Sequence, residues 1–181
     1  QNGLLEYDIE ANETSLWTDV NSLSDIDLTC LGNYAPQNAL YIGYENGNID
    51  KIVNNQVTNI PAIRLAQVQG NKRINRIVPY QGFVYFATSF SIVKIDPVKN
   101  EVRETFYPTV EGSAVYDIAF KGDSIYALTS TKMLRANINN NALGDPAQWT
   151  TDTRLQELTA NSYKDIEIID DNIYVLFKGD G

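Results

Sequence analysis

The sequence predicts an all-β chain built from β-propeller blades, because one short strand pattern recurs four times along it. Each copy centres on a tyrosine within an apolar run, and successive tyrosines lie 44, 41 and 48 residues apart. A repeat of roughly 40 to 50 residues made of short strands is typical of propeller blades. The four copies are Ala39–Gly43, Phe83–Ala87, Ser124–Leu128 and Asn172–Leu176.

The tyrosine strand is expected to be the second strand of each blade, because another strand pattern precedes it. An isoleucine stands eight residues before each of the last three tyrosines. Short polar turns rich in Gly, Asn and Asp separate the two runs, which is the pattern of a β-hairpin. The first strands are predicted over Ile74–Tyr80, Val115–Phe120 and Tyr163–Ile169, and they contain Ile77, Ile118 and Ile166.

Two further strands are expected after the tyrosine strand, which gives each blade four antiparallel strands. Polar turns again separate these runs. Helical spacing of apolar residues is found only weakly, in Thr153–Asn161. The third strands are predicted over Ile49–Val53, Ile92–Ile95 and Met133–Ala136, and the fourth strands over Gln56–Ile60 and Val102–Phe106.

The strands around the tyrosines read as nearly continuous apolar runs, which indicates sheets that are covered on both faces. Face-to-face stacking of neighbouring blades provides such cover. We therefore expect the tyrosines to be packing residues whose hydroxyl groups take a hydrogen-bond partner. These tyrosines are Tyr41, Tyr85, Tyr126 and Tyr174.

Both ends of the chain are predicted to be half blades. Leu4–Ile9 resembles a third strand and Ser15–Thr18 a fourth strand, while the chain stops just after a second strand. Trp17 and Trp149 lie 132 residues apart, which is three units of 44. We therefore expect a single partial propeller domain over residues 1–181. Its half blades are 1–20 and 163–181, and its full blades are 25–60, 71–106 and 113–152.

Such an arrangement leaves strand edges and apolar blade faces open at both ends, and these favour association. Three outcomes follow from the sequence. The half blades join within one chain as a four-bladed ring, two chains complete each other head to tail, or the chain is a fragment of a longer propeller. We favour a fragment that is able to pair with itself.

Composition argues against nucleic acid as a partner. The chain carries a net charge of −9 and has a pI of about 4.4. The densest basic run is Lys72–Arg73 with Arg76 nearby, whereas a nucleic-acid binder is expected to present a basic face. The sequence contains no run of 18 apolar residues, so no transmembrane helix is expected.

Histidine is missing from the chain, and only one cysteine is present. The chain has no histidine, which excludes Ser-His-Asp and Cys-His arrangements and the commonest metal ligand. Cys30 is the only cysteine and lies in an apolar strand-like run, so we expect a buried structural thiol. We expect no enzyme activity, no cofactor and no metal.

Few residues stand out as candidates for a functional surface. Phe90, Phe106 and Tyr107 are aromatic residues near turns, and they form the expected contact surface. The Asp170–Asp171 pair lacks the alternating spacing of a calcium loop, so metal binding is not expected there. Asn46–Asn48 is interpreted as a turn that needs a positive φ angle.

Several segments resemble one family of bacterial propellers. The chain is similar to the N-terminal propeller of PorZ, a component of the type IX secretion system of Bacteroidetes, and is related to the two-component regulator propeller repeats. The resemblance covers essentially the whole chain. It is carried by Asp25–Leu31, Ala39–Asp50, Lys72–Asn75, Asp117–Phe120 and Ala147–Thr150.

The resemblance implies a non-enzymatic module that is exported and held in the periplasm or at the outer-membrane cell surface. It also implies an attachment complex with the sortase-like peptidase PorU, and contact with anionic lipopolysaccharide or another glycan. The second propeller and the sorting domain of this family are missing from the sequence. No ligand residue of the family is transferred to a position in this chain.

Two other functions remain open from the sequence. One is the extracellular sensor propeller of a hybrid two-component system that binds a glycan, and the parent gene downstream of the Gly181 codon distinguishes it. The other is an enzyme such as a lyase or glycosidase, which would need carboxylates, tyrosines or a metal to converge on the axial channel.

Overall fold

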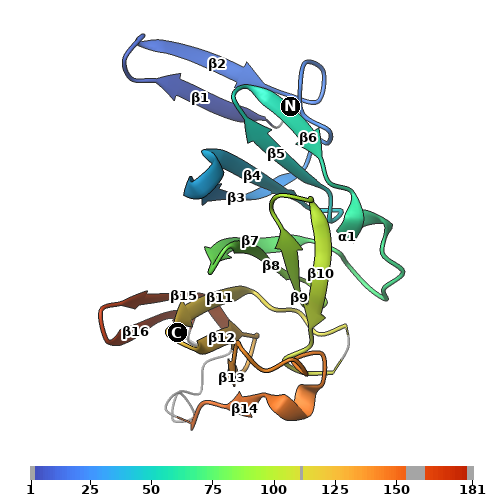
Figure 1. The fold of residues 1–181 in the computed structure, drawn as a ribbon, viewed down its shortest axis with the longest axis vertical. Coiled ribbons are helices and arrows are strands. Elements are labelled where there is room, and N and C mark those ends of the chain that lie inside the picture. The colour runs from blue at the N-terminus through green and yellow to red at the C-terminus, as the bar shows by residue number, and fades with distance from the viewer. Residues whose placement is uncertain (1–2, 111, 154–161, 179–181) are drawn as a thin grey trace.

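The computed structural model describes residues 3–110, 112–153 and 162–178, and it is an open stack of β-sheets (Figure 1). Among these described residues, three sheets have four antiparallel strands, and a two-stranded hairpin lies at each end of the stack. Strands follow one another in chain order within every sheet. The predicted fold class, a partial β-propeller of four-stranded antiparallel blades, is confirmed.

The strands agree closely with the sequence pattern. The first hairpin consists of β1 (Leu4–Asp8) and β2 (Glu13–Trp17), and the last of β15 (Ser162–Ile169) and β16 (Asn172–Lys178). The first sheet contains β3 (Leu28–Tyr34), β4 (Ala39–Tyr44), β5 (Ile49–Val53) and β6 (Gln56–Asn59). The second sheet contains β7 (Ile74–Tyr80), β8 (Phe83–Thr88), β9 (Ile92–Asp96) and β10 (Glu101–Phe106). The third sheet contains β11 (Asp117–Lys121), β12 (Ser124–Leu128), β13 (Met133–Asn137) and β14 (Thr150–Thr151).

Short helical turns occur only in connections within the described ranges. The helix α1 (Ala62–Leu65) follows β6, and two 3-10 turns cover Ala35–Gln37 and Pro146–Gln148. Of the segment Thr153–Asn161, which has weak helical spacing, all but Thr153 lies outside the described residues.

Hairpin turns use residues that tolerate a left-handed backbone. Asn54 and Asn55, between β5 and β6, have φ angles of 48° and 60°, as a two-residue type I′ turn requires. Gly47 lies in the β4–β5 turn with a φ angle of 84°, which agrees with the interpretation of Asn46–Asn48 as a turn. Asparagine therefore takes much of the role that glycine has in other hairpins.

The core consists of apolar layers between successive sheets. One layer joins the first and second sheets, a second joins the second and third, and smaller layers join each terminal hairpin to its neighbour. Tyr41, Tyr85 and Tyr126 are buried in these layers, as expected. Tyr174 is 54% exposed, so the expectation is wrong for this residue, because none of the sheets in the described residues covers the outer face of β16.

The hydroxyl groups of the buried tyrosines do not follow the expectation everywhere. Tyr44 donates a hydrogen bond of 2.7 Å to the buried carboxylate of Asp50. The buried hydroxyl of Tyr41 has no hydrogen-bond partner among the described residues, so the expected partner is missing there. Burial of a polar group without a partner costs free energy, and the aromatic contact between Tyr41 and Phe86 helps to offset it.

Close approach of the first and second sheets depends on glycine. A Cβ atom on Gly32 of β3 would lie 2.4 Å from Cγ2 of Ile77 on β7, and one on Gly43 would lie 2.7 Å from Cγ2 of Ile74. Real Cβ atoms do not come so near to other carbons. The absence of a side chain at both positions therefore lets the first and second sheets pack tightly.

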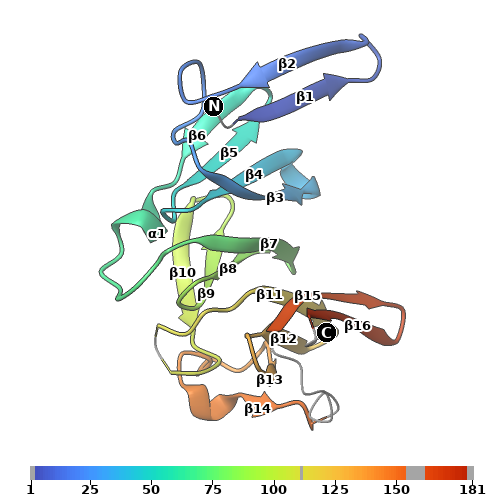
Figure 2. The same cartoon turned by 180° about the vertical axis from the view of Figure 1, so that it is seen from behind.

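The two terminal hairpins lie at opposite ends of the stack in both views (Figures 1 and 2). They form separate sheets and do not pair with each other. A four-bladed ring closed within one chain, one of the three outcomes considered, is therefore not formed.

Candidate contact surfaces

A polar cluster connects β7, β11 and β15 where these strands approach one another. They are the first strands of the second sheet, the third sheet and the last hairpin. Arg76 of β7 lies 3.4 Å from a carboxylate oxygen of Asp117 on β11, and its Nη2 donates a 2.5 Å hydrogen bond to Glu167 on β15. Asp165 of β15 interacts with the same guanidinium group. One cation therefore links three successive sheets.

Asp117 is the buried centre of this cluster. Its carboxylate accepts hydrogen bonds from the backbone N–H of Ile118, at 2.7 Å, and of Ile166, at 2.9 Å. Burial, together with a hydrogen bond to Asp165, raises the pKa of Asp117 to about 7, against the opposing effect of the nearby N–H groups and of Arg76. The same shared hydrogen bond lowers the pKa of Asp165. The two carboxyl groups therefore share a proton over part of the acidic pH range.

Several carboxylates lie close together on the first strands of the sheets. They form hydrogen bonds or ion pairs with one another, with Arg76 and with backbone N–H groups. Two of them pair with Arg76, and Asp117 holds the N–H of the neighbouring sheet. Within the ranges that the structure describes, no three Asp, Glu or Cys side chains are placed to hold a metal ion. The contacts of this cluster connect three successive sheets.

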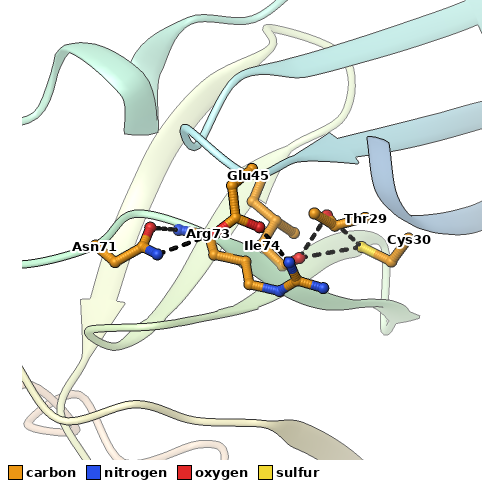
Figure 3. A network of polar contacts seen from close by, with 6 residues as sticks. All are labelled: Thr29, Cys30, Glu45, Asn71, Arg73 and Ile74. Atoms are coloured by element: carbon orange, nitrogen blue, oxygen red, sulfur yellow. Dashed lines mark hydrogen bonds and ion pairs between the residues drawn. The ribbon is translucent and has the colours of Figure 1, made fainter. Parts of the chain in front are cut away.

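A second polar network connects β3 and the β4–β5 turn to the segment before β7 (Figure 3). Thr29 Oγ1 donates a 2.6 Å hydrogen bond to the carbonyl oxygen of Ile74. Arg73 forms an ion pair with Glu45, and Asn71 Nδ2 donates a 3.0 Å hydrogen bond to the same carboxylate. These contacts hold the first two sheets together at one edge.

Cys30 belongs to this network and is half-buried, where full burial was expected. Its Sγ lies 3.6 Å from the carbonyl oxygen of Ile74, toward which the thiol donates. Burial raises the pKa of the Cys30 thiol to about 11, so the sulfur stays protonated and weakly nucleophilic near neutral pH. This agrees with a structural role.

The aromatic residues expected to form a contact surface are mostly inside the protein. Phe90 and Phe106 are each only 3% exposed, so the expectation that they lie on the surface is wrong. Phe106 packs near the ring of Tyr85, at 6.2 Å between centroids. Proximity to a turn does not imply exposure here, because neighbouring sheets and α1 cover these rings.

Tyr107 is half-buried and lies with Phe90 along a shallow groove of about 190 Å³ between α1 and β10. The structure thus brings two of the three expected residues together and separates Phe106 from them. Apolar side chains dominate the lining, which includes Ala62, Ala66, Val68, Val93 and Val102.

A larger pocket of about 490 Å³ lies between the first hairpin and the first sheet. Leucines from β1, β3 and β4 line it together with Trp17, whose Nε1 donates a 2.9 Å hydrogen bond to Glu6. Sequence reasoning missed this pocket, because its walls come from separate strands that each read as ordinary strand sequence.

The remaining sequence candidates have local roles. Lys121 donates to the backbone carbonyl of Asp170 at 2.9 Å and forms an ion pair with Asp171.

No helix in the described part of the chain is long and apolar enough to cross a membrane.

Four-stranded antiparallel sheets are stacked face to face, and the first strands of successive sheets lie next to one another. This arrangement defines a protein of the β-propeller class. Residues 1–150 match the family model described as the N-terminal β-propeller domain of PorZ of the type IX secretion system, TSS9. The chain belongs to this family. No curated protein matches the sequence.

Solved structures show the same fold. PorZ from Porphyromonas gingivalis, a bacterial surface component of the type IX secretion system, is 24% identical with a TM-score of 0.81, and the match covers 97% of this chain and 23% of PorZ. The extracellular domain of BT4673 from B. thetaiotaomicron, described as a hybrid two-component system, is 20% identical with a TM-score of 0.73 over 96% of this chain and 23% of that one. The chain thus spans about a quarter of these proteins.

Proposed function

We propose that the chain is a non-enzymatic propeller module of a type IX secretion attachment complex. The observation that carries this proposal is the match of residues 1–150 to the PorZ propeller family. In this proposal residues 1–181 form one partial propeller domain of an exported protein, located in the periplasm or at the outer-membrane cell surface.

The proposed partners are the sortase-like peptidase PorU and anionic lipopolysaccharide, and the open ends are proposed to associate as well. The lack of histidine and the mutual engagement of Asp117, Asp165 and Arg76 support a binding role over a catalytic one. Tyr107 and the groove beside α1 are the proposed protein-contact surface, with Phe90 as its floor.

The test is a binding assay with the full-length parent protein and this chain side by side, against purified PorU and against anionic lipopolysaccharide. We expect the parent to bind at least one of them, and Tyr107→Ala to weaken PorU binding roughly ten-fold, as for a central aromatic contact. Tyr116→Ala, which alters another partly exposed tyrosine, is the matched control. Absence of binding to both partners would refute the proposal.

A second candidate is a sensor propeller that binds an extracellular glycan, favoured by the similarity to BT4673. The parent gene downstream of the Gly181 codon distinguishes the two. A transmembrane helix followed by a kinase supports the sensor, whereas a second propeller and a sorting domain support the secretion module.

A further inference from the structure

Asp117 lies at the junction between the third sheet and the last hairpin, where β11 and β15 are side by side in both views (Figures 1 and 2). Its side chain is 2% exposed. One carboxylate oxygen accepts the hydrogen bond from the N–H of Ile166 on β15, and the other accepts from Ile118 on its own strand. A change in the charge of this carboxyl group therefore acts directly on the backbone of β15.

The hydrogen bond between the carboxyl groups of Asp117 and Asp165 requires a proton. Ionised carboxylates are acceptors only, so a hydrogen bond joins two of them only when one is protonated. Burial favours Asp117 as the protonated partner, because Asp165 is only half-buried. The raised pKa of Asp117, about 7, and the lowered pKa of Asp165 agree with this assignment.

Within the described residues, three carboxyl groups of this cluster share one guanidinium group. Arg76 on β7 contacts Asp117, and it also contacts Glu167 and interacts with Asp165, both on β15. A single cation does not neutralise three carboxylates. Loss of the proton from Asp117 therefore leaves two like charges facing each other across the β11–β15 contact.

The other strand packed against β11 and the second cation of β15 do not offset this charge. Strand β12 consists of uncharged residues and places Leu128 opposite Asp117. On β15, the Nζ atom of Lys164 lies over the ring of Tyr116, 6.0 Å from its centroid. The charge balance at Asp117 is therefore determined by β7 and by the carboxylates of β15.

We propose that this cluster makes the contact between the third sheet and the last hairpin dependent on pH. With a proton on Asp117, the side chain donates to Asp165 and accepts from the N–H of Ile166, so β15 is held against β11. Without the proton, the two carboxylates repel each other and β15 separates from β11 more often. This property of the sheet junction goes beyond the proposed binding role.

The direction of the pH effect separates this proposal from a purely structural role. An ionised carboxylate is the stronger hydrogen-bond acceptor, so Asp117 acting only as an anchor for the N–H of Ile166 would hold β15 more tightly as the pH rises. Burial and the bond to Asp165 outweigh that effect, because the pKa of Asp117 lies above its ordinary value. We therefore expect the contact to weaken as the pH rises through neutrality.

Hydrogen exchange of single backbone amides, followed by NMR, tests the proposal on the unmodified chain. The protection of the Ile166 amide is measured at about pH 6 and about pH 8, after correction for the intrinsic effect of pH on exchange. We expect it to fall roughly ten-fold relative to the amide of Phe86, since one titrating proton changes an equilibrium by up to about ten-fold per pH unit. Phe86 lies in the core of the second sheet and reports global opening.

Asp117→Asn is the informative variant, because an amide keeps both bonding roles of the protonated carboxyl group and does not titrate. We expect its Ile166 amide to be equally protected at both pH values. Asp19→Asn, at an exposed position in a turn, is the matched control and should keep the pH dependence of the unmodified chain. Circular dichroism confirms that both variants fold.

Four results would overturn the proposal. In the unmodified chain, these are protection of Ile166 that does not change with pH, protection that increases with pH, and an equal change at Phe86. The fourth is a pH dependence at Ile166 that persists in Asp117→Asn.

Discussion

The interior and the ends of the stack contain the same repeated strand, but the equivalent side chains differ in how far they are buried. Tyr85 in the second sheet is 1% exposed and contacts Phe106 and Phe120, whereas its equivalent Tyr174 is 54% exposed on the last hairpin. The sequences around the two tyrosines are alike, so the difference arises because a further sheet covers Tyr85, whereas no sheet of the described residues covers Tyr174. In this fold, the burial of a side chain depends on whether another sheet packs against its strand, and not on the sequence of the strand alone.

The largest expected effect compares these two tyrosines directly. Tyr85→Ala should lower the free energy of unfolding by about 3–5 kcal/mol, because it removes a buried aromatic ring from a packed layer. Tyr174→Ala should cost less than about 1 kcal/mol, because its ring is half in solvent. Urea unfolding of both variants measures the difference, and similar losses would contradict the comparison.

A smaller effect is expected where the first two sheets meet. Gly32→Ala should destabilise the protein by roughly 1–3 kcal/mol, because the new methyl group overlaps Ile77 and forces the sheets apart. Gly144→Ala is the matched control, since its Cβ atom would meet only the carbonyl oxygen of Thr105 at an ordinary 3.5 Å. Thermal unfolding of the two variants checks this, and an equal change in both would show that the close approach does not matter.

The smallest effect concerns the junction between the third sheet and the last hairpin. The pKa of Asp117 is raised from 3.8 to about 7, so within that window the folded state binds a proton that the unfolded state has lost. The contribution of this carboxyl to stability is therefore greatest at the acidic end and falls as the pH rises through the window.

Asp117→Asn should therefore flatten the dependence of the unfolding free energy on pH across that window. Asp165 acts in the opposite direction, because its lowered pKa gives a contribution that is lost as the pH falls below its ordinary value of 3.8. Urea unfolding at a series of pH values provides the measurement. A slope unchanged by Asp117→Asn would exclude this carboxyl as its source.

The sequence was sufficient for the architecture because each strand carries its own apolar pattern and each turn its own Asn, Asp or Gly. The β7 strand was predicted over the observed residues, Ile74–Tyr80, and Ile77, Ile118 and Ile166 are buried as inner-strand residues should be. These features depend on local chemistry, which a single sequence contains.

Side-chain environments could not be predicted in the same way, because they depend on contacts between strands far apart in the chain. Phe90 and Phe106 looked exposed beside turns, yet α1 and the adjoining sheets cover them. The pairing of Asp117 with Arg76 and Asp165 joins three separate repeats, and nothing in one repeat indicates it. The expected burial of the repeated tyrosines fails at Tyr174 for the same reason.

Arg76 has a consequence for the curvature of the stack. Its guanidinium group lies where β7, β11 and β15 converge and contacts carboxylates on both of the following sheets. These contacts hold the inner strands of three sheets at a fixed spacing. One side chain therefore helps to set the angle at which successive sheets pack and so the curvature of the stack.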